Sequence, residues 1–232
     1  MANPKKETFT SPAGKALYPK LQEADTKFKK EGEFSVKLLL SEADAAFIRS
    51  QCEEAQEAAF QEEFEKQCAA KPKMKPEKIA EGIKRADLPV KPYEDPETGD
   101  ETGEWQVTFK TKASGTNKKG EPWERKVPLF DAKAQAITGK LPQIWSGSIM
   151  KVSYSVDPFC TAIGAGCTLR ILAVQILQLK TGGARDAGEY GFGAEDDGYA
   201  YIPADDENDL PGGEGEAPFA SADDNDDGQE DF

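Results

Sequence analysis

The sequence predicts a mainly β protein: a small, twisted, partly open barrel of about five strands, with one long inserted α-helix and an acidic tail. Three observations predict this class. Short stretches of alternating apolar and polar residues are typical of strands, the stretch 41–68 keeps the spacing of a helix, and acidic residues gather at the C-terminal end. We therefore expect a folded domain over residues 1–180 and a disordered tail over residues 181–232.

A strand and a long helix are the first elements that the pattern predicts. Apolar residues alternate with polar ones over 34–40, as in a strand with one buried face. Ser41 then provides an N-cap, with Asp44 three residues later, and apolar or small residues keep helical spacing from Ile48 to Cys68. The expected helix carries a net charge of −6, so the rest of the folded part carries +8. The total charge therefore conceals a basic surface.

The remaining elements are expected to be strands joined by turns and loops. Residues 69–96, rich in Lys and Pro, indicate an extended basic connection. The stretch 105–112 alternates apolar residues with Gln, Thr and Lys, which predicts a strand with one buried and one basic face. Further on we expect a hairpin turn at 116–120, a strand at 123–130, a short helix or loop at 131–141, and strands at 149–156 and 167–179 joined through the glycine-rich stretch 161–166.

The C-terminal tail carries most of the charge imbalance. Residues 181–232 hold 17 of the 43 acidic residues and a single base, Arg185, which gives this segment −16 and leaves +2 for residues 1–180. Ten of the 21 glycines lie in the same segment, and aliphatic side chains are scarce, so it cannot bury enough apolar surface to offset chain entropy. A polyanion attached to a near-neutral domain can imitate a nucleic-acid backbone, towards a partner or towards the basic groove of its own domain.

The composition argues against an enzyme. The chain contains no histidine, which removes the commonest general base, the commonest metal ligand and the usual Ser/His and Cys/His pairs. A phosphate-binding loop of the G-x-x-x-x-G-K-[ST] kind is also absent. We therefore expect no enzymatic activity, no cofactor and no metal. No apolar run is long enough for a membrane span, and residues 1–10 lack the plan of a signal peptide, so we expect a soluble intracellular protein without membrane contact.

The four cysteines show no C-x-x-C pair. Cys52 and Cys68 are sixteen residues apart on the expected helix, roughly 24 Å by the helical rise, which is too far for a disulfide. Cys160 and Cys167 could face each other across a hairpin. We favour buried, reduced thiols for the set.

Cations and aromatic rings on the expected strands suggest a nucleic-acid surface. Single strands require cations for their phosphates and exposed rings for their unstacked bases, and neither requirement depends on the base sequence. The candidate DNA-binding residues are Lys91, Tyr93, Lys110, Lys112, Trp123, Arg125, Lys126, Lys151, Tyr154 and Phe159.

Some aromatic and basic residues also have a plainer interpretation. Trp105 and Phe109 share a face with Val107 and are expected in the core. Tyr154 has the same parity as two nearby valines, so core and groove suit it equally. Any of the lysines could belong to a solvated surface, and Trp145 is expected to be a packing residue.

Four segments in combination resemble one known family. They are Lys91-Pro92-Tyr93-Glu94 before an acidic glycine turn and a lysine-bearing strand, Gly147-Ser148 with Lys151-Val152-Ser153-Tyr154-Ser155, Thr161-Ala162-Ile163-Gly164-Ala165-Gly166 before the final strand, and Gly182-Gly183 before an acidic tail that ends in Asp-Phe. Together they resemble the single-stranded DNA-binding proteins of tailed podophages, from residue 34 to residue 232. The loop before Thr161 departs from the family pattern, because it is shorter and offers one aromatic residue, Phe159.

The resemblance implies a fold, a function and a set of partners. It implies an OB-fold domain that coats single-stranded DNA during phage DNA replication, recombination and repair, in the cytoplasm of the infected bacterial host. It also implies that the tail contacts the replication polymerase and the primase-helicase, with Phe232 as the anchor. The partner-binding residues are then Asp223, Asp224, Asp226, Asp227, Glu230, Asp231 and Phe232.

The leading hypothesis is therefore a sequence-neutral single-stranded DNA-binding protein whose tail competes for the groove when DNA is absent. One alternative is a polyanionic DNA mimic or a chaperone of basic proteins, in which the tail itself is the active element. A second alternative, a nuclease, would need a cluster of carboxylates around a metal, whereas the acids of the folded part lie mainly on the expected helix. The oligomeric state is left open, and a homodimer is compatible with the sequence.

Overall fold

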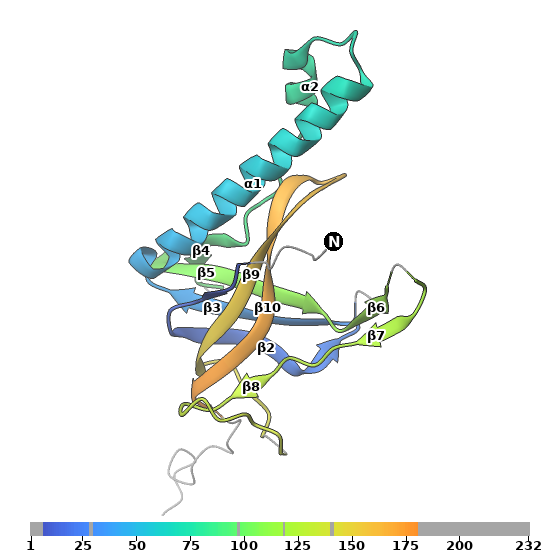
Figure 1. The fold of residues 1–232 in the computed structure, drawn as a ribbon. Coiled ribbons are helices and arrows are strands. Elements are labelled where there is room, and N and C mark those ends of the chain that lie inside the picture. The colour runs from blue at the N-terminus through green and yellow to red at the C-terminus, as the bar shows by residue number, and fades with distance from the viewer. Residues whose placement is uncertain (1–6, 28–29, 97, 118, 140–141, 181–232) are drawn as a thin grey trace, which may run out of the picture. The chain divides into compact units, whose positions relative to one another are not determined.

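The computed structural model describes residues 7–27, 30–96, 98–117, 119–139 and 142–180 of the 232-residue chain. Across these ranges the fold is mainly β, with ten strands and two helices (Figure 1). The strands are β1 (Phe9–Thr10), β2 (Gly14–Asp25), β3 (Glu33–Leu40), β4 (Val90–Glu94), β5 (Glu101–Lys112), β6 (Ser114–Thr116), β7 (Pro122–Glu124), β8 (Leu129–Phe130), β9 (Ile149–Thr161) and β10 (Gly164–Gln178). The helices are α1 (Glu42–Ala70) and α2 (Pro76–Gly82).

Five of the strands form a barrel. The order is β2-β3-β5-β10-β9, and β9 pairs again with β2, so the sheet returns to its first strand. The closing contacts are short: β2 and β9 pair at Gly14 and Met150, and β5 and β10 run parallel and pair at Phe109 and Leu169. A five-stranded barrel with this crossover is the OB-fold, as expected, with β2, β3, β5, β9 and β10 as its first to fifth strands.

The first barrel strand, β2, was not predicted from the sequence. Its apolar pattern is irregular, because its pairing with β3 shifts register between Leu17 and Lys20 and again before Asp25. Such irregularities interrupt the two-residue period on which strand prediction depends. The expected order of one strand, a helix and four strands therefore lacked the strand that completes the barrel.

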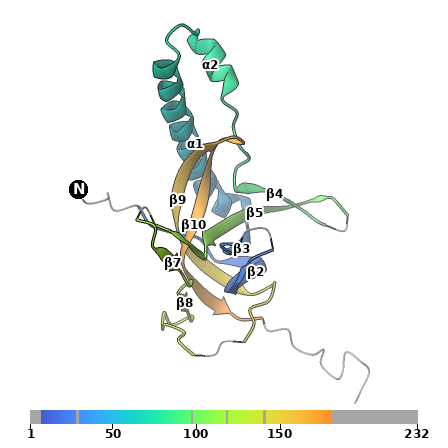
Figure 2. The ribbon, with the colours of Figure 1, turned by 90° about the vertical axis from the view of Figure 1, so that its right-hand side faces the viewer.

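The long helix α1 begins where the sequence predicts. The Ser41 side chain accepts a hydrogen bond from the backbone N of Asp44 at 3.2 Å, which caps the first turn. The first half of the helix buries Ala45, Ile48 and Cys52 against the barrel. The second half runs past the barrel beside the tip of the β9–β10 hairpin, as both views show (Figures 1 and 2).

The stretch 69–96 differs from the extended connection that we predicted. It contains α2, with Pro76 in the first turn, where its missing N–H costs no hydrogen bond. Ile79 and Ile83 of this segment pack with Ala59 of α1 in a second, smaller core. The chain then returns to the barrel as β4, which is antiparallel to β5. In the sequence, the apolar side chains of Ile79 and Ile83 in a lysine-rich stretch were the signal that could have predicted this packing.

The expected strand at 123–130 is only partly present. It is divided into β7 and β8, and β7 pairs with β6 in a separate hairpin rather than with the barrel. Pro128 lies between the two pieces and cannot donate a ladder hydrogen bond, which agrees with the interruption. Residues 132–139, within the segment predicted as short helix or loop, form a loop.

The barrel interior contains most of the core, and Phe109 is fully buried as predicted. Trp105 is half-buried and packs against the same core, whereas Trp145, predicted to pack, is 47% exposed. All four cysteines are free. Cys52 and Cys167 are buried beside each other, and their thiol–thiol hydrogen bond, with burial, raises the pKa of Cys52. The prediction of buried thiols is wrong for Cys160, which is exposed, and Cys68 is half-buried.

Candidate nucleic-acid interface

A groove crosses the outer face of the barrel where β5, β10 and the end of β9 meet the β6–β7 hairpin. Its first part encloses about 400 Å³, and its second part encloses about 510 Å³ towards the segment between α2 and β4. Lys110, Phe159 and Thr168 line both parts, so the two form one groove. The first part is also lined by Glu33, Thr111, Lys112, Trp123, Arg125, Asp157, Pro158 and Arg170.

The strand period places the cations on this outer face. In β5, Val107 and Phe109 are fully buried, so the alternate residues Lys110 and Lys112 face outwards. The parallel pairing of β5 with β10 then sets Arg170 directly opposite Lys110. Three cations from two strands therefore line one side of the groove.

Carboxylates accompany two of these cations. Arg170 forms an ion pair with Asp157 of β9, and Lys112 Nζ lies 2.9 Å from Glu31 Oε2. Lys110 makes no ion pair within the described ranges. The Asp157 side chain is 11% exposed and holds Arg170 in place, whereas Lys110 can turn towards a ligand.

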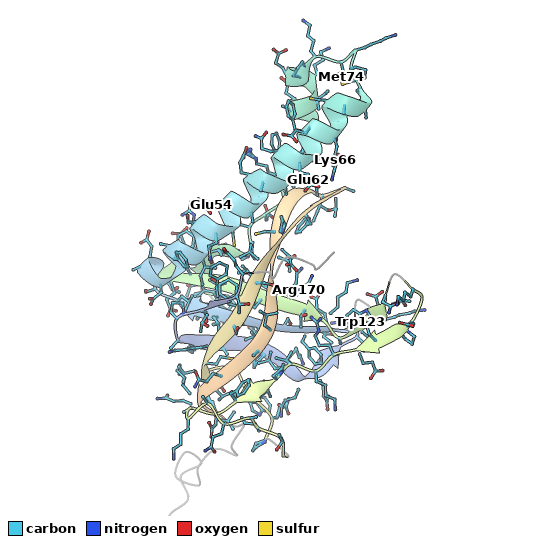
Figure 3. All side chains as sticks on the ribbon, in the orientation of Figure 1. Glu54, Glu62, Lys66, Met74, Trp123 and Arg170 are labelled. Atoms are coloured by element: carbon cyan, nitrogen blue, oxygen red, sulfur yellow. The ribbon has the colours of Figure 1, made fainter. Side chains whose placement is uncertain are left out.

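The indole of Trp123 forms the wall of the groove on the hairpin side. Trp123 lies opposite Gly115 in the β6–β7 pair, where a Cβ would come within 2.8 Å of the indole. The Arg125 guanidinium lies 5.5 Å from the centre of the ring, and its Nη1 donates to Thr111 Oγ1 at 3.1 Å. In Figure 3, Trp123 on β7 and Arg170 on β10 lie on the same side of the barrel. The hairpin therefore offers a ring and a cation to the same groove.

Phe159 provides a second aromatic ring from the β9–β10 hairpin. It lies opposite Gly166, where a Cβ would approach the Phe159 ring to 2.8 Å. The hairpin tip is anchored to α1, because Gln56 Nε2 donates to the carbonyl oxygens of Ala86 and Ala165 at 2.7 and 3.1 Å. The ring therefore projects into the groove from a fixed support.

The other predicted residues lie in several places. Lys91 and Tyr93 belong to β4, which continues the sheet beside β5 at the far end of the groove. Lys126 is exposed beyond Arg125 but does not line the groove. Lys151 lines a different hollow, with Phe130 and Gln175, that shares no residue with the groove.

The structure corrects the prediction that Tyr154 binds DNA. Its side chain is fully buried, its ring packs against Phe109 with centroids 5.2 Å apart, and its hydroxyl donates to Gln51 Oε1 at 2.7 Å. Burial raises its pKa to about 12, so the phenol stays protonated at ordinary pH. The ring is part of the core and cannot stack on a base.

Two arginines of the groove were missed in the sequence. Arg170 is the sole charged residue in the apolar stretch 167–179, and a single charge in a buried strand is the signal that could have found it. Arg85 lines the second part of the groove, pairs with Glu57 at 2.5 Å and lies 4.6 Å from the centre of the Phe60 ring. It was hidden in a segment that we predicted to be an extended connection.

Three other expectations concern metal ions, the membrane and the acidic tail. Within the described ranges, no cluster of three or more acidic or cysteine side chains is arranged to hold a metal ion. No helix in those ranges is both long and apolar enough to cross a membrane. The tail residues predicted to bind partners, 223–232, lie outside the described residues.

The fold and the groove together define the class of protein. The groove lies on the third barrel strand and on the hairpin of the fourth and fifth strands, with Glu33 of the second strand at its edge, close to the strand face and the loop by which OB-fold proteins bind oligonucleotides and oligosaccharides. With its cations and aromatic rings, this chain is an OB-fold protein of the oligonucleotide-binding kind.

The chain belongs to the family of the single-stranded DNA-binding protein of bacteriophage T7, whose family model matches residues 13–179. It is 32% identical over 168 residues to the single-stranded DNA-binding protein of Escherichia phage T7, and this match covers 68% of the chain and 67% of the relative. It is 33% identical over 122 residues to that of Enterobacteria phage T3, and this match spans about half of each protein, 50% of the chain and 52% of the relative. These relatives are named as binding proteins, in agreement with the expectation that the chain is not an enzyme.

A solved structure shares the fold. The crystal structure of the single-stranded DNA-binding protein encoded by bacteriophage T7 superposes with a TM-score of 0.61 at 24% sequence identity. The match covers 85% of the present chain and 100% of the other chain. This match confirms the expected fold, and the family model and the phage T7 relative confirm the expected likeness to podophage single-stranded DNA-binding proteins.

Proposed function

We propose that the protein binds single-stranded DNA without sequence preference and acts in phage DNA replication, recombination and repair. The observation that carries the proposal is the groove, in which five cations and two aromatic rings line one face of an OB-fold barrel. The family to which the chain belongs supports the choice of ligand. The site of action would be the cytoplasm of the infected bacterial host.

The groove residues would divide the work by chemistry. Lys110, Lys112, Arg125 and Arg170 would neutralise phosphates, and the rings of Trp123 and Phe159 would stack on bases. Every base offers a π-face, so such a surface needs no particular sequence. Lys91 and Tyr93 on β4 would extend the path beyond the groove, and Lys126 would add a cation near its hairpin side.

The ion pairs of the groove fit reversible binding. The Glu31 carboxylate next to Lys112 occupies the place that a phosphate would take, and both side chains are about half exposed, so the exchange leaves no buried charge unpaired. Asp157 keeps Arg170 in position in either state. The groove would therefore be formed before DNA arrives, which lowers the entropic cost of binding.

We assign two further roles to the acidic tail. Its 17 carboxylates would compete with DNA for the groove, because a tethered polyanion acts at an effective concentration in the millimolar range. Once displaced, the tail would recruit the replication polymerase and the primase-helicase through Asp223, Asp224, Asp226, Asp227, Glu230, Asp231 and Phe232.

The test compares single-stranded and double-stranded oligonucleotides of equal length in a gel-shift titration, with the full chain and with a chain that ends at residue 183. We expect tighter binding of the single strand, and still tighter binding without the tail. A DNA mimic or chaperone would lose its activity with the tail, and equal binding of duplex and single strand would contradict the proposal. Incubation with magnesium checks the nuclease alternative, since products of cleavage would support it.

A further inference from the structure

A second aromatic surface lies on β2, on the outer face of the barrel that also carries the groove. The Tyr18 side chain is 65% exposed, and Nζ of Lys37 on β3 lies 5.9 Å from the centre of its ring. Lys37 is directly opposite Thr108 of β5, and Thr108 lines the second part of the groove. Across two strand spacings, Tyr18 is therefore roughly 10 Å from β5.

The backbone at Tyr18 adopts a conformation that bulky residues rarely take. Its φ is 47°, in the left-handed region, and the pairing of β2 with β3 shifts register between Leu17 and Lys20. A bulge of this kind re-aims a side chain, and such irregularities are over-represented next to functional sites. Residues held in sparsely populated conformations likewise cluster where a ligand is held.

Hydrogen bonds from the segment before β9 hold this conformation. The backbone N of Tyr18 donates to Ser146 Oγ at 2.9 Å. On the same side of β2, Gly147 N donates to Ala16 O, and Ala16 N donates to Ser148 O, each at 2.8 Å. The bulge is therefore fixed from the edge opposite β3, and the ring is presented outwards before any ligand binds.

The surroundings of the ring are basic rather than apolar. Lys37 lies over the ring, Lys20 is exposed and opposite Ser35 of β3, and Pro19 follows directly in the chain. Tyr93 of β4 lies near Tyr18, because its pKa is raised by desolvation and then by Tyr18, with smaller effects of Asp95 and Glu104. An apolar protein hot spot would need apolar neighbours, whereas an anionic ligand with a flat aromatic part suits this surface.

We propose that Tyr18 is a stacking platform for an unpaired base of single-stranded DNA, with Lys37 and Lys20 holding the adjacent phosphates. This subsite extends the DNA path from the groove across β3 to β2. The inference rests on the proposed function, since it assigns a further contact to the same ligand. The inference goes beyond the proposed function because it adds β2, a strand of the barrel that does not line the groove.

The experiment measures the affinity of the full chain for a single-stranded oligothymidylate across a salt series. Tyr18→Gly removes the ring, yet glycine accepts positive φ, so the fold should be at least as stable as the native one. We expect binding to weaken roughly five- to a hundredfold with an unchanged salt slope, because no charge is lost. Tyr18→Phe keeps the ring and should bind like the native chain. Lys37→Ala should lower the slope by about 0.7, as one phosphate contact is lost.

The groove variant Trp123→Ala separates the two proposals. If Trp123→Ala weakens binding but Tyr18→Gly does not, the subsite is wrong and the groove function stands. If the native chain fails to bind the oligonucleotide, the proposed function itself fails. As a direct readout, photo-crosslinking to iodouracil-containing DNA should label the peptide with Tyr18, and labelling confined to groove peptides would overturn the inference.

Discussion

The indole of Trp123 lies directly on the backbone of Gly115, its partner across the β6–β7 pair. Phe159 has the same relationship with Gly166 across the β9–β10 pair. In both pairs the missing side chain of the glycine leaves room for the ring next to the neighbouring strand. The glycines thus set the height of the two rings above the floor of the groove.

The substitution Gly115→Ala tests this arrangement. The added Cβ would come within 2.8 Å of Trp123 Cζ2, and Trp123 supplies all three of the atoms nearest to it, so the indole must move. The ring is still present in this variant, but it is displaced. We therefore expect the free energy of single-strand binding to weaken by up to about 1–3 kcal/mol, the value of one lost stack. Fluorescence anisotropy with labelled oligonucleotide measures the change. Gly139→Ala, where a Cβ meets nothing within 4 Å, is the matched control and should bind normally.

Lys110→Ala should reduce the salt dependence of binding. Lys110 lines both parts of the groove and has no ion-pair partner in the described ranges, so a phosphate is the partner that we expect for it. Removal of one phosphate contact should lower the slope of log affinity against log salt by about 0.7. Lys133→Ala removes an exposed lysine that lines no part of the groove and should keep the native slope. Equal slopes for all three proteins would contradict the placement of DNA in the groove.

Tyr154 should make folding stability depend on pH in the alkaline range. Its pKa rises from an ordinary 10.0 to about 12 in the folded chain, because burial disfavours the phenolate. The unfolded chain therefore loses this proton first, so the contribution is complete below pH 10 and is lost as pH rises towards 12. At about 1.4 kcal/mol per pKa unit, the loss amounts to roughly 2–3 kcal/mol.

Denaturant unfolding between pH 8 and 12 measures this contribution. Tyr154→Phe should remove the alkaline component, and it should lower stability near pH 8 by about 1 kcal/mol through loss of the hydrogen bond to Gln51. DNA affinity of the variant should be native at neutral pH. Weakened binding without a loss of stability would return Tyr154 to the DNA surface.

Truncation after Gly183 tests the competition between tail and DNA. It removes 17 acids and Arg185, a change of +16 in net charge. Single-strand binding should tighten, most of all at low salt, since the competing interaction is electrostatic. Recovery of the replication polymerase in a pull-down should be lost. If affinity is unchanged at low salt, the tail does not occupy the groove.

Deletion of Phe232 alone separates the ring from the charge. All acidic side chains remain, so DNA affinity should be nearly native. Docking to the polymerase should weaken, because an apolar anchor that enters a pocket supplies contact that diffuse charge cannot. Pull-down of the polymerase at matched salt compares the two chains. Equal recovery would reduce the partner contact to electrostatics.

The barrel was predictable where side-chain periodicity is regular. The alternation in 34–40 and 105–112, and the Ser41 cap, gave β3, β5 and the start of α1 within a few residues. The strand β2 escaped because its bulges break the two-residue period. The helix α2 was missed because Ile79 is its one buried residue, and Ile83, which packs in the same small core, follows directly after its end.

The chemistry of the groove was predictable from the sequence, but the full set of residues that line it was not. Lys110 and Lys112 follow from strand parity, Trp123 from the absence of a core role, and Phe159 from its place as the aromatic ring of the loop before Thr161. Arg170 could be found as the single charge of its strand, but its place opposite Lys110 depends on a parallel pairing between strands about sixty residues apart, which no local pattern contains. Parity left Tyr154 between core and groove, and the structure decides for the core, because Met150, Val152 and Tyr154 are all fully buried on one face of β9.

The position of β10 in the barrel has a consequence for biosynthesis. This strand pairs with β5, β8 and β9, so it completes the sheet although it is the last of the described strands to be translated. A nascent chain therefore cannot assemble the parallel β5–β10 contact until residues 169 and 170 have left the ribosome. Contacts of such long sequence separation are slow to form. Until then the lysines of β5 lack Arg170 as a neighbour, and a product truncated before β10 would lack this side of the groove.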